Sequence, residues 1–429
     1  MKLRSICKTV FCILMSFCII FGLCSCQRVK LVKLYVRDYG IVPNDITYTA
    51  ENIKKINKLI KKAEKGQLVI FDEGTYYIDG AIEVIDKEIF SVSGTYTKIV
   101  NTAYDAKFTD TSLSQMFKIK NCDQLFVNSF TLSYYRYNSF CASISKHDFR
   151  NDFTYLYPYD EFNSETKVTV SGDEPISSCY IENEHGLLKP YNALDIIYDS
   201  NTGYYVERIL GETSNSVCYE FSSNSAPVVS VENSNNVEFD DLNIKEAGGS
   251  AFEIKNSSNT KITRSTLSIT ENKDNAVLSF KNAINADNVS GDTTVSKCDF
   301  NGISGNAVTV NSSGNVTIEN CSFSNIAGNG LAISGASFNI SKCDFKYISK
   351  SAISAANTAE KSNVNDCDFD VIGEHIISAD TSGIINVSGN TSSAPIYSDE
   401  PYKFTNTQIN DTDNTIATKA TDTTEQHKG

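Results

Sequence analysis

The hydrophobic and polar positions of the chain repeat every 22 to 24 residues between Ser296 and Ala379. Each repeat has a cysteine followed two residues later by a phenylalanine, and apolar residues flank this pair at fixed distances. The positions between these columns carry mostly Asn, Ser, Asp, Lys and Thr. This alternation predicts short β-strands, and the long period predicts a solenoid whose strands stack about 4.8 Å apart. The columns are Cys298, Cys321, Cys343 and Cys367; Val295, Ile318, Ile340 and Val364; Phe300, Phe323, Phe345 and Phe369; Ile303, Ile326, Ile348 and Ile372; and Val308, Leu331, Ile353 and Ile377.

The four repeated cysteines are expected to be buried free thiols. Cysteine is a small, soft side chain that packs well in a stack of equivalent positions. A metal site needs several ligands close together, commonly a tetrahedron, and a column with one cysteine per coil does not supply it. We therefore expect neither a metal nor a cofactor, with metal ligation or catalysis by these thiols as the alternative.

The same register extends upstream of the cysteines. Leu242 and Ser265 take the cysteine position, which brings the number of aligned coils to six. Residues 124–132, QLFVNSFTL, show the same pattern as residues 236–244, NVEFDDLNI. The solenoid is therefore predicted to begin before residue 130 and to be interrupted by an insertion.

The segment from Asp38 to Val84 resembles the opening of the pectin-lyase-like right-handed parallel β-helix proteins. The matching features are Asp-Tyr-Gly at 38–40, a turn at Asp45 and Thr47, an amphipathic helix, and a strand LVIF that runs into Gly-Thr-Tyr. The residues predict the helix independently, because Thr49 is a good N-cap and one face is apolar. The resemblance implies an all-β fold, a right-handed parallel β-helix with an N-terminal capping helix over its open end and an inserted β-rich subdomain. The apolar face consists of Ile53, Ile56, Ile60 and Ala63.

Both ends of the chain carry segments that are not expected to join the solenoid. Residues 1–26 have a basic start, a short apolar run and then LCSC, a pattern typical of an export signal. The last four of these residues resemble the lipobox of bacterial lipoproteins, which implies a lipidated Cys26, a membrane anchor and a place in the bacterial cell envelope. An ordinary cleaved signal peptide is the alternative. Residues 386–429 lack an apolar period, so we expect disorder there.

The charge balance restricts the partners. Removing Lys2, Arg4 and Lys8 from the 38 basic residues leaves 35 against 52 acidic residues, a net charge near −17. Such a surface repels nucleic acid and polyuronates unless a local basic patch or Ca²⁺ intervenes. Export permits disulfides, but four cysteines allow three pairings and the sequence does not choose between them. These cysteines are Cys122, Cys141, Cys179 and Cys218.

A second resemblance covers roughly residues 125–232. The stretch FVNSFTLSYYRYNSF and the Tyr-rich segment after it are similar to the small barrel inserted into the β-helix of α-1,3-galactosidase-like glycoside hydrolases. Twelve of the 22 tyrosines lie between Tyr134 and Tyr219, and because the chain has no Trp, a sugar would have to stack on Tyr or Phe. The alternative is that these tyrosines form the core of the insertion. The candidate substrate-binding residues are Tyr134, Tyr135 and Tyr137.

The resemblance to these hydrolases also implies paired carboxylates on the coils after the insertion. One acid must protonate the leaving oxygen while a second carboxylate attacks or activates water, about 5 to 9.5 Å away. Glu253 is the only charge in an outward column of the aligned coils, and Asp274 on the next coil is its candidate partner. Asn275 stands where the family would lead us to expect a second Asp, and an amide cannot ionise. The rest of the column is Thr309, Ala332, Ser354 and Ser378.

Other acids and histidines are expected to be structural or surface residues. Asp299, Asp344 and Asp368 follow the repeated cysteines on the outer face and predict a solvated charged surface. His375 takes a position that Ser or Asn holds in other coils. His147 and His185 have no recognisable partner in the sequence.

Two functions from different classes remain open. The first is a surface-anchored glycoside hydrolase acting on neutral, galactose-like glycan ends through Glu253 and Asp274. The second is a non-catalytic glycan-binding protein or adhesin, which Asn275 favours. A polysaccharide lyase or epimerase is a third alternative, although the motif series of polygalacturonases is missing and Arg is scarce on the repeat face. Either main function implies a polysaccharide or glycoconjugate partner, no nucleic acid, and a monomer.

The predicted domain organisation follows from these segments. It comprises a lipoprotein signal (1–26), the cap and first coils (27–132), the β-rich, Tyr-rich insertion (133–232), the later coils (233–395) and a low-complexity tail (396–429).

Cys26→Ser tests the lipid anchor. We expect the wild type to fractionate with membranes and the variant to be released into the medium, because acylation needs the thiol. Immunoblotting of membrane and medium fractions measures this, and unchanged membrane retention of the variant would refute the assignment.

Overall fold

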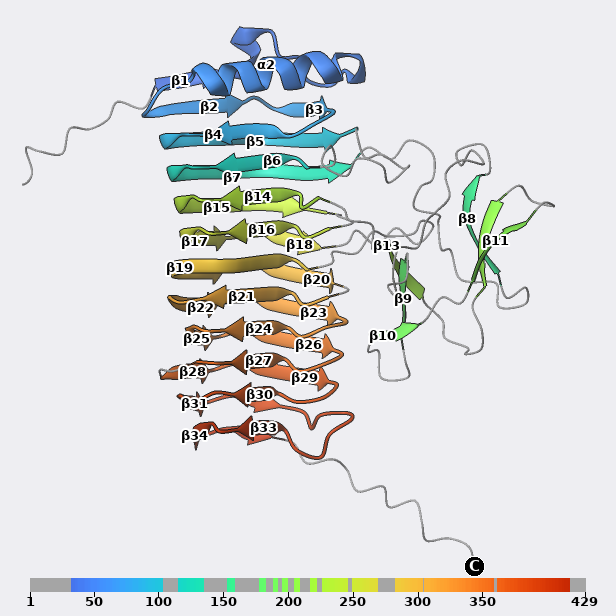
Figure 1. Ribbon diagram of the computed structural model, residues 1–429, viewed down its shortest axis with the longest axis vertical. Helices are drawn as coiled ribbons and strands as arrows, with labels where there is room; N and C mark the ends of the chain where they lie inside the picture. Colours follow the sequence, from blue (N-terminus) through green and yellow to red (C-terminus); the bar gives the residue numbers. More distant parts are fainter. Residues whose placement is uncertain are drawn as a thin grey trace, which may run out of the picture.

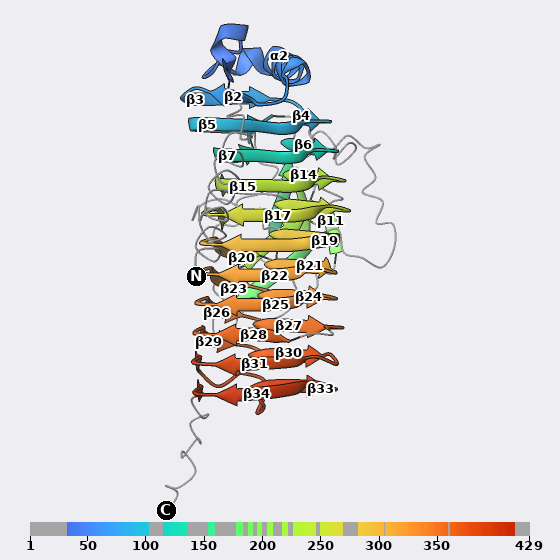
Figure 2. The same cartoon turned by 90° about the vertical axis from the view of Figure 1, so that its left-hand side faces the viewer.

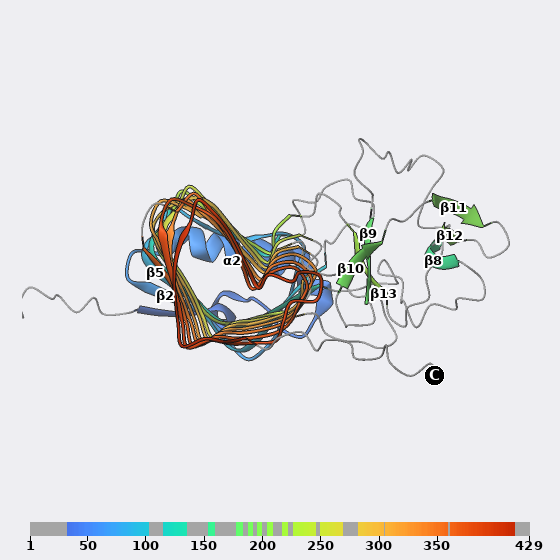
Figure 3. The ribbon, with the colours of Figure 1, turned by 90° about the horizontal axis from the view of Figure 1, so that it is seen from below.

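The computed structural model describes residues 32–102, 115–134, 226–245, 249–268, 282–303, 305–358 and 361–416, and the backbone of strands β8–β13 between residues 153 and 221. Its main body is one 29-stranded sheet that winds as a parallel β-helix, coil upon coil (Figure 1). Seen along the axis, successive coils superpose closely, as expected when equivalent residues stack (Figure 3). The predicted all-β solenoid is confirmed. Within the described residues, no helix combines the length and hydropathy needed to cross a bilayer.

Each coil has three sides, here called the first, second and third faces. The first face contains β4 (Ile82–Ile85), β6 (Phe117–Lys120), β14 (Val229–Glu232), β16 (Phe252–Lys255), the start of β19 (Ile284–Ser296), β21 (Val308–Ser312), β24 (Leu331–Ser334), β27 (Ile353–Ala356), β30 (Ile377–Asp380) and β33 (Tyr402–Thr405). The second face contains β1 (Val32–Tyr35), β2 (Gln67–Phe71), the first parts of β5 (Glu88–Asn101), β7 (Asp123–Tyr134) and β15 (Asn235–Ile244), β17 (Ser258–Thr263), the end of β19, β22 (Asn315–Glu319), β25 (Ser337–Ser341), β28 (Ser362–Asn365), β31 (Ile384–Ser388) and β34 (Gln408–Thr412).

The third face contains the last parts of β5, β7 and β15, with β3 (Gly74–Ile78), β18 (Thr266–Ser268), β20 (Asp299–Ile303), β23 (Ser322–Ile326), β26 (Asp344–Ile348), β29 (Asp368–Ile372), β32 (Thr391–Ser392) and β35 (Thr415–Ile416). The other described strands form two antiparallel three-stranded sheets. They are β8 (Phe153–Pro158), β9 (Ser177–Glu182), β10 (Leu188–Tyr191), β11 (Asp195–Asp199), β12 (Tyr204–Arg208) and β13 (Val217–Phe221).

The repeated cysteines lie at the inside of the corner between the second and third faces. The residue before each has a left-handed backbone, for example φ 55° at Lys297 and 54° at Lys342. Each thiol donates to backbone carbonyls at this bend, in addition to the backbone hydrogen bonds between coils. Cys321 Sγ lies 3.3 Å from Glu319 O and 3.7 Å from Val295 O of the preceding coil. The cysteine column is thus a ladder of small hydrogen-bond donors as well as a packing column.

These thiols are buried and free, as predicted. The hydrogen bond with Cys321 and the burial of the thiol raise the pKa of Cys343 to about 12, so it stays protonated at neutral pH. Cys122 holds the equivalent place at the corner between the first and second faces, where its Sγ donates to Lys120 O over 3.4 Å. It is also a free thiol, so it does not enter the disulfide pairings left open by the sequence. Cys141 lies outside the described residues, and the side chains of Cys179 and Cys218 are likewise not described.

Apolar side chains fill the bore in the predicted columns. Phe300, Phe323, Phe345 and Phe369 stack with centroid separations of 4.8, 4.6 and 5.1 Å and nearly parallel rings. The upstream register is confirmed, because Leu267 pairs with Ile244 and Phe300, and Val127 pairs with Phe239. Burying these aromatic rings adds a large apolar contact between successive coils.

The predicted capping helix is confirmed as α2 (Thr49–Lys62), which lies across the first coil (Figure 1). It follows two short 3-10 helices, η1 (Val36–Tyr39) and η2 (Ile46–Tyr48). Ile56, Leu59 and Ile60 are its buried apolar residues. Thr49 is the first helical residue and Tyr48 is the N-cap, so the predicted cap position was one residue late.

Polar side chains attach α2 to the exposed edge of the first coil. Asn57 donates to Ala81 O and accepts from Glu83 N, both at 2.9 Å, and so replaces the missing neighbour of β4. Lys87 donates to Ala63 O at 2.6 Å and thereby satisfies a carbonyl at the end of the helix. The helix therefore satisfies backbone groups as well as covering apolar side chains.

Two predicted boundaries are wrong. Strands β31 to β35 continue the β-helix to Ile416, so residues 386–416 are not a disordered tail. Their Asn- and Thr-rich sequence still provides β-branched and amide side chains that stack from coil to coil. The predicted insertion ended at residue 232, whereas β14 already pairs with β6 and β16 from Val229.

Phe323→Ala should lower the free energy of unfolding by roughly 3 to 5 kcal/mol, because a ring leaves a close-packed stack. Asp344→Ala on the outer side of the same face should change it by no more than about 0.5 kcal/mol. Denaturant titration with probes at both ends of the solenoid measures the difference. Equal midpoints for the two variants would contradict the assignment of inner and outer columns.

Candidate functional site

Glu253 lies on the outer side of the first face, in the column expected from the sequence. The backbone register pairs it with Ser230 above and Asn285 below, and the column continues through the predicted Thr309 and Ala332. Beyond the coils aligned from the sequence, the column also contains Glu83, Lys118 and Lys403. Glu253 is therefore not the only charge in the whole column.

A lysine neutralises Glu253 locally. Lys255 Nζ lies 2.7 Å from Glu253 Oε1, and the Glu253 side chain is 27% exposed. The hydrogen bond to Glu253 raises the pKa of Lys255, and the charges of Asp287 and Glu232 raise it further. A raised lysine pKa means that the charged form of Lys255 is favoured, and this ammonium forms the ion pair with Glu253.

The strand register brings two more carboxylates to the same patch. Lys255 pairs with Glu232 on the coil above and with Asp287 on the coil below. Each is one strand and two residues away from Glu253, a Cα separation of roughly 8 Å at standard strand spacings. Lys120 forms a further ion pair with Glu232 at 3.1 Å. Extending the sequence alignment two residues past Glu253 would have revealed this second charged column.

The patch lies on the first face, next to the corner at which the connecting segments vary most in length. The segments between the third and first faces span residues 102–116, 135–228, 245–251 and 269–283 at successive upper coils. At lower coils the same corner takes four residues, as at 327–330, 349–352 and 373–376. All the long segments therefore begin and end next to the first-face strands that carry Glu253 and its neighbours.

Most of the other predicted site residues lie outside the described part of the chain. Asp274, Tyr135, Tyr137 and Cys26 fall there, as do His147 and His185. Tyr134 ends β7 and is 8% exposed within the hydrophobic core cluster. Tyr134 therefore packs in the core of the β-helix, which differs from both expectations for the tyrosines, sugar binding and a core of the insertion.

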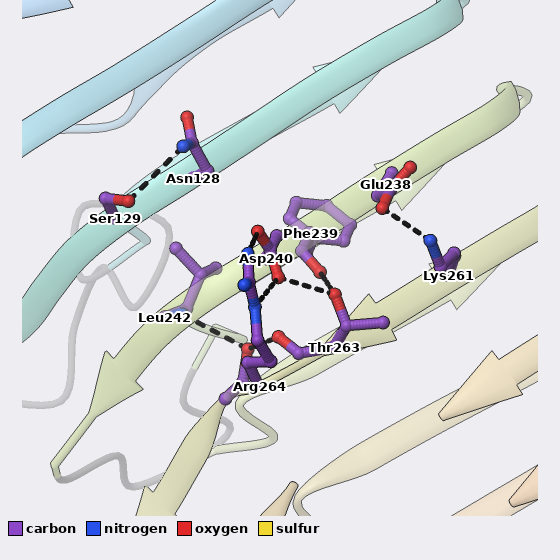
Figure 4. Close-up of polar contacts among 10 residues, drawn as sticks. Asn128, Ser129, Glu238, Phe239, Asp240, Leu242, Lys261, Thr263 and Arg264 are labelled. Carbon is purple, nitrogen blue, oxygen red and sulfur yellow. Dashed lines mark hydrogen bonds and ion pairs between the residues drawn. The ribbon is translucent and has the colours of Figure 1, made fainter. Parts of the chain in front are cut away.

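A buried carboxylate lies on the second face, at Asp240. Arg264 from the next coil donates to both carboxylate oxygens, with Nε 2.8 Å from Oδ1, and Thr263 Oγ1 donates to Oδ1 at 2.7 Å (Figure 4). The Asp240 side chain is only 9% exposed. These hydrogen bonds, that of Arg264 first, lower the pKa of Asp240. With its charge fully compensated, Asp240 acts as a structural tie between coils.

Two further expectations from the sequence concern the position of His375 and metal binding. His375 lies in the predicted column, since Ala352 N bonds His375 O as Ala307 N bonds Asn329 O. Its Nδ1 lies 3.0 Å from Glu400 O, a backbone contact. Within the part of the chain that the structure describes, no group of three or more His, Cys, Asp or Glu side chains could hold a metal ion.

Comparison with known proteins agrees with the geometry of the coils. Residues 282–395 match the family described as "Right handed beta helix region". The fold is a right-handed parallel β-helix. The resemblance to pectin-lyase-like proteins noted in the sequence is thus confirmed for the fold. Among curated proteins, none matches the chain by sequence.

Several solved structures share this architecture at low identity. The A-module of mannuronan C-5 epimerase AlgE6 from Azotobacter vinelandii is 10% identical, with a TM-score of 0.45 and coverage of 90% of this chain and 99% of that one. The surface protein and adhesin PfbA of Streptococcus pneumoniae is 12% identical, with a TM-score of 0.41 and coverage of 90% and 97%. The endo-xylogalacturonan hydrolase of Aspergillus tubingensis is 11% identical, with a TM-score of 0.43 and coverage of 90% and 93%. At such identities the likeness concerns the fold alone.

Asp240→Asn should destabilise the protein by roughly 1 to 3 kcal/mol at pH 7, because charged hydrogen bonds to Arg264 are lost. The folded pKa of Asp240 is lowered, so its contribution is present above the unfolded pKa of about 4 and disappears as the pH falls through the folded value. The difference between wild type and variant should therefore shrink below pH 4.

Glu238→Gln is the matched control. Glu238 lies on the same strand as Asp240, and its ion pair with Lys261, at 2.7 Å, is exposed. It should change stability by at most about 1 kcal/mol. Urea titrations from pH 7 to pH 2.5 measure the stability difference between the wild type and Asp240→Asn. If this difference stays constant over that range, the Asp240 carboxylate is not held ionised.

Proposed function

We propose that this protein is a glycoside hydrolase of the bacterial cell surface, anchored through Cys26 and acting on neutral, galactose-like glycan ends. The observation that carries the proposal is the patch around Glu253. Glu253, in an ion pair with Lys255, has Glu232 and Asp287 one coil away on either side. Paired carboxylates at such a distance are the chemical requirement for glycosidic hydrolysis.

The proposed roles follow from the charges. Because Glu253 forms an ion pair with Lys255, we assign Glu253 the role of nucleophile or of base towards water. A second carboxyl group must then protonate the leaving oxygen. Asp274 is the partner expected from the sequence, and the strand register makes Glu232 and Asp287 further candidates at similar distances from Glu253. The β-helix suits such a pair because strand spacing fixes the distance between successive coils.

A neutral substrate fits the charge of the protein. The chain has a formal net charge of −14, which repels polyanions at long range. On the first face, Lys118, Lys120 and Lys255 are offset by acidic residues of the same coils, among them Glu232 and Glu253. This patch therefore has no excess of positive charge with which to bind a uronate polymer.

A non-catalytic glycan-binding protein or adhesin is the second candidate function. The ion pair with Lys255 favours it, because a carboxylate already bound to a lysine must break that contact before it can attack a sugar. The two functions differ in one property, namely turnover.

Glu253→Gln should reduce hydrolysis of aryl-galactosides by roughly 10² to 10⁴-fold without changing the fold, because an amide can neither attack nor accept a proton. Asp274→Asn and Asp287→Asn, measured side by side, identify the proton donor as the variant with the larger loss. Glu83→Gln is the control, since it lies in the same column on a coil near the cap. Full activity of Glu253→Gln, or no hydrolysis by the wild type, would exclude the proposal.

A further inference from the structure

The lower coils present an uncharged polar surface on their second face. Strands β25, β28 and β31 contain no charged residue, and apart from the exposed Ile384 their outward positions carry amides and hydroxyls. One asparagine repeats in register from coil to coil, with Asn339 paired to Asn363, Asn363 to Asn386, and Asn386 to Asn410. We call this surface the amide wall and define it as Asn339, Asn363, Asn365, Asn386, Ser388 and Asn410.

Hydrogen bonds between coils hold the amides in fixed orientations. Asn386 Nδ2 donates to Asn363 Oδ1 at 2.7 Å, and Asn410 Nδ2 donates to Asn386 Oδ1 at 2.9 Å. Ser388 donates to Asn365 Oδ1 at 2.8 Å. Each bond uses one N–H of an amide and one lone pair of the next. Asn386 Nδ2 also donates to Ser362 O at 3.4 Å, so Asn386 offers a ligand its second lone pair. The groups that these bonds leave unused are oriented in advance, which lowers the entropic cost of binding a ligand.

The wall is open and differs from the other outer surfaces. No described helix or strand lies over β25, β28, β31 and β34 (Figure 2). Higher on the same face, the outward positions carry the Glu238–Lys261 and Asp240–Arg264 ion pairs. On the third face, the same coils carry Lys346 and Asp370, 3.5 Å apart. The outward positions of β25, β28 and β31 are thus uncharged, with Lys342, Lys361 and Asp366 exposed at the turns beside them.

We propose that the amide wall binds an extended, neutral polysaccharide that runs along the solenoid axis. A primary amide offers a donor and an acceptor side by side, which complements neighbouring hydroxyl groups of a sugar. The amides recur at the roughly 4.8 Å step between coils, so a polymer of similar units can repeat the same weak contact along the wall. With no cation on the wall, a uronate polymer gains no charge pairing there. The class of ligand rests on the proposed function, whereas the site is separate from the first-face patch.

Retention on insoluble polysaccharide tests the wall. The mature chain is incubated with insoluble galactan, mannan, xylan and amorphous cellulose, with cross-linked polygalacturonate as the charged comparison. We expect retention on at least one neutral polymer and none on polygalacturonate. Asn363→Ala/Asn386→Ala should weaken that retention at least tenfold. Asn410→Ala, confined to the last described coil, should weaken it less and leaves the folding of the other coils unaffected.

Asn243→Ala/Asn301→Ala is the matched control, because Asn301 also accepts an amide hydrogen bond between coils, from Asn325 at 2.8 Å, but on the third face. It should bind as the wild type does. Glu253→Gln should also bind normally, so loss of hydrolysis and loss of binding are separate results. Wild-type turnover without wall-dependent binding would overturn this inference alone.

Three further results would overturn the proposal. The first is unchanged retention of Asn363→Ala/Asn386→Ala, and the second is retention of the wild type on polygalacturonate only or on no polymer. The third is a wild-type dimer in analytical ultracentrifugation that becomes a monomer in this variant. Amide ladders can pack face to face between identical chains, so that outcome would assign the wall to self-association.

Discussion

The inside of each corner is the constraint on which the coils depend. A single left-handed residue turns the chain from the second face to the third, and the side chain of the next residue packs inside the corner. Leu242 fills this position with an apolar side chain, and in later coils a small side chain there donates a hydrogen bond to a backbone carbonyl. Cys321 does this through its thiol, Ser265 through its hydroxyl and Asn390 through its amide, which reaches Val364 O at 3.0 Å. Once this position is fixed in every coil, all other columns fall into register.

Because the bore is filled by stacked side chains, variation is confined to the outside. The first face carries the charged patch around Glu253, and the second face carries ion pairs above and amides below. The corner between the third and first faces takes the long segments of the upper coils. An invariant interior thus permits different surfaces on one scaffold, which is why the fold leaves the chemistry open.

The two ends of the solenoid are protected by different means. At the first coil, α2 covers the bore with Ile56 and Ile60, while Asn57 bonds the free strand edge. In the last described coil, Asp411 takes the inward column that Val364 and Val387 hold above it. A charge at an inward position opposes the addition of another strand. One end is therefore closed by packing and the other carries a charge that resists stacking.

The sequence by itself determined the repeat, the register and the cap, because each rests on local periodicity and on side chains that must recur in every coil. The Cys-x-Phe columns, the outward position of Glu253 and the helix before β2 were all readable in this way. It did not determine the end of the solenoid, because the Asn- and Thr-rich strands after residue 386 have little apolar alternation and are held by pairing with the coil above. Only the tertiary structure decided which charges meet. Glu232, Lys255 and Asp287 are far apart in sequence and become neighbours because strand pairing sets them one coil apart.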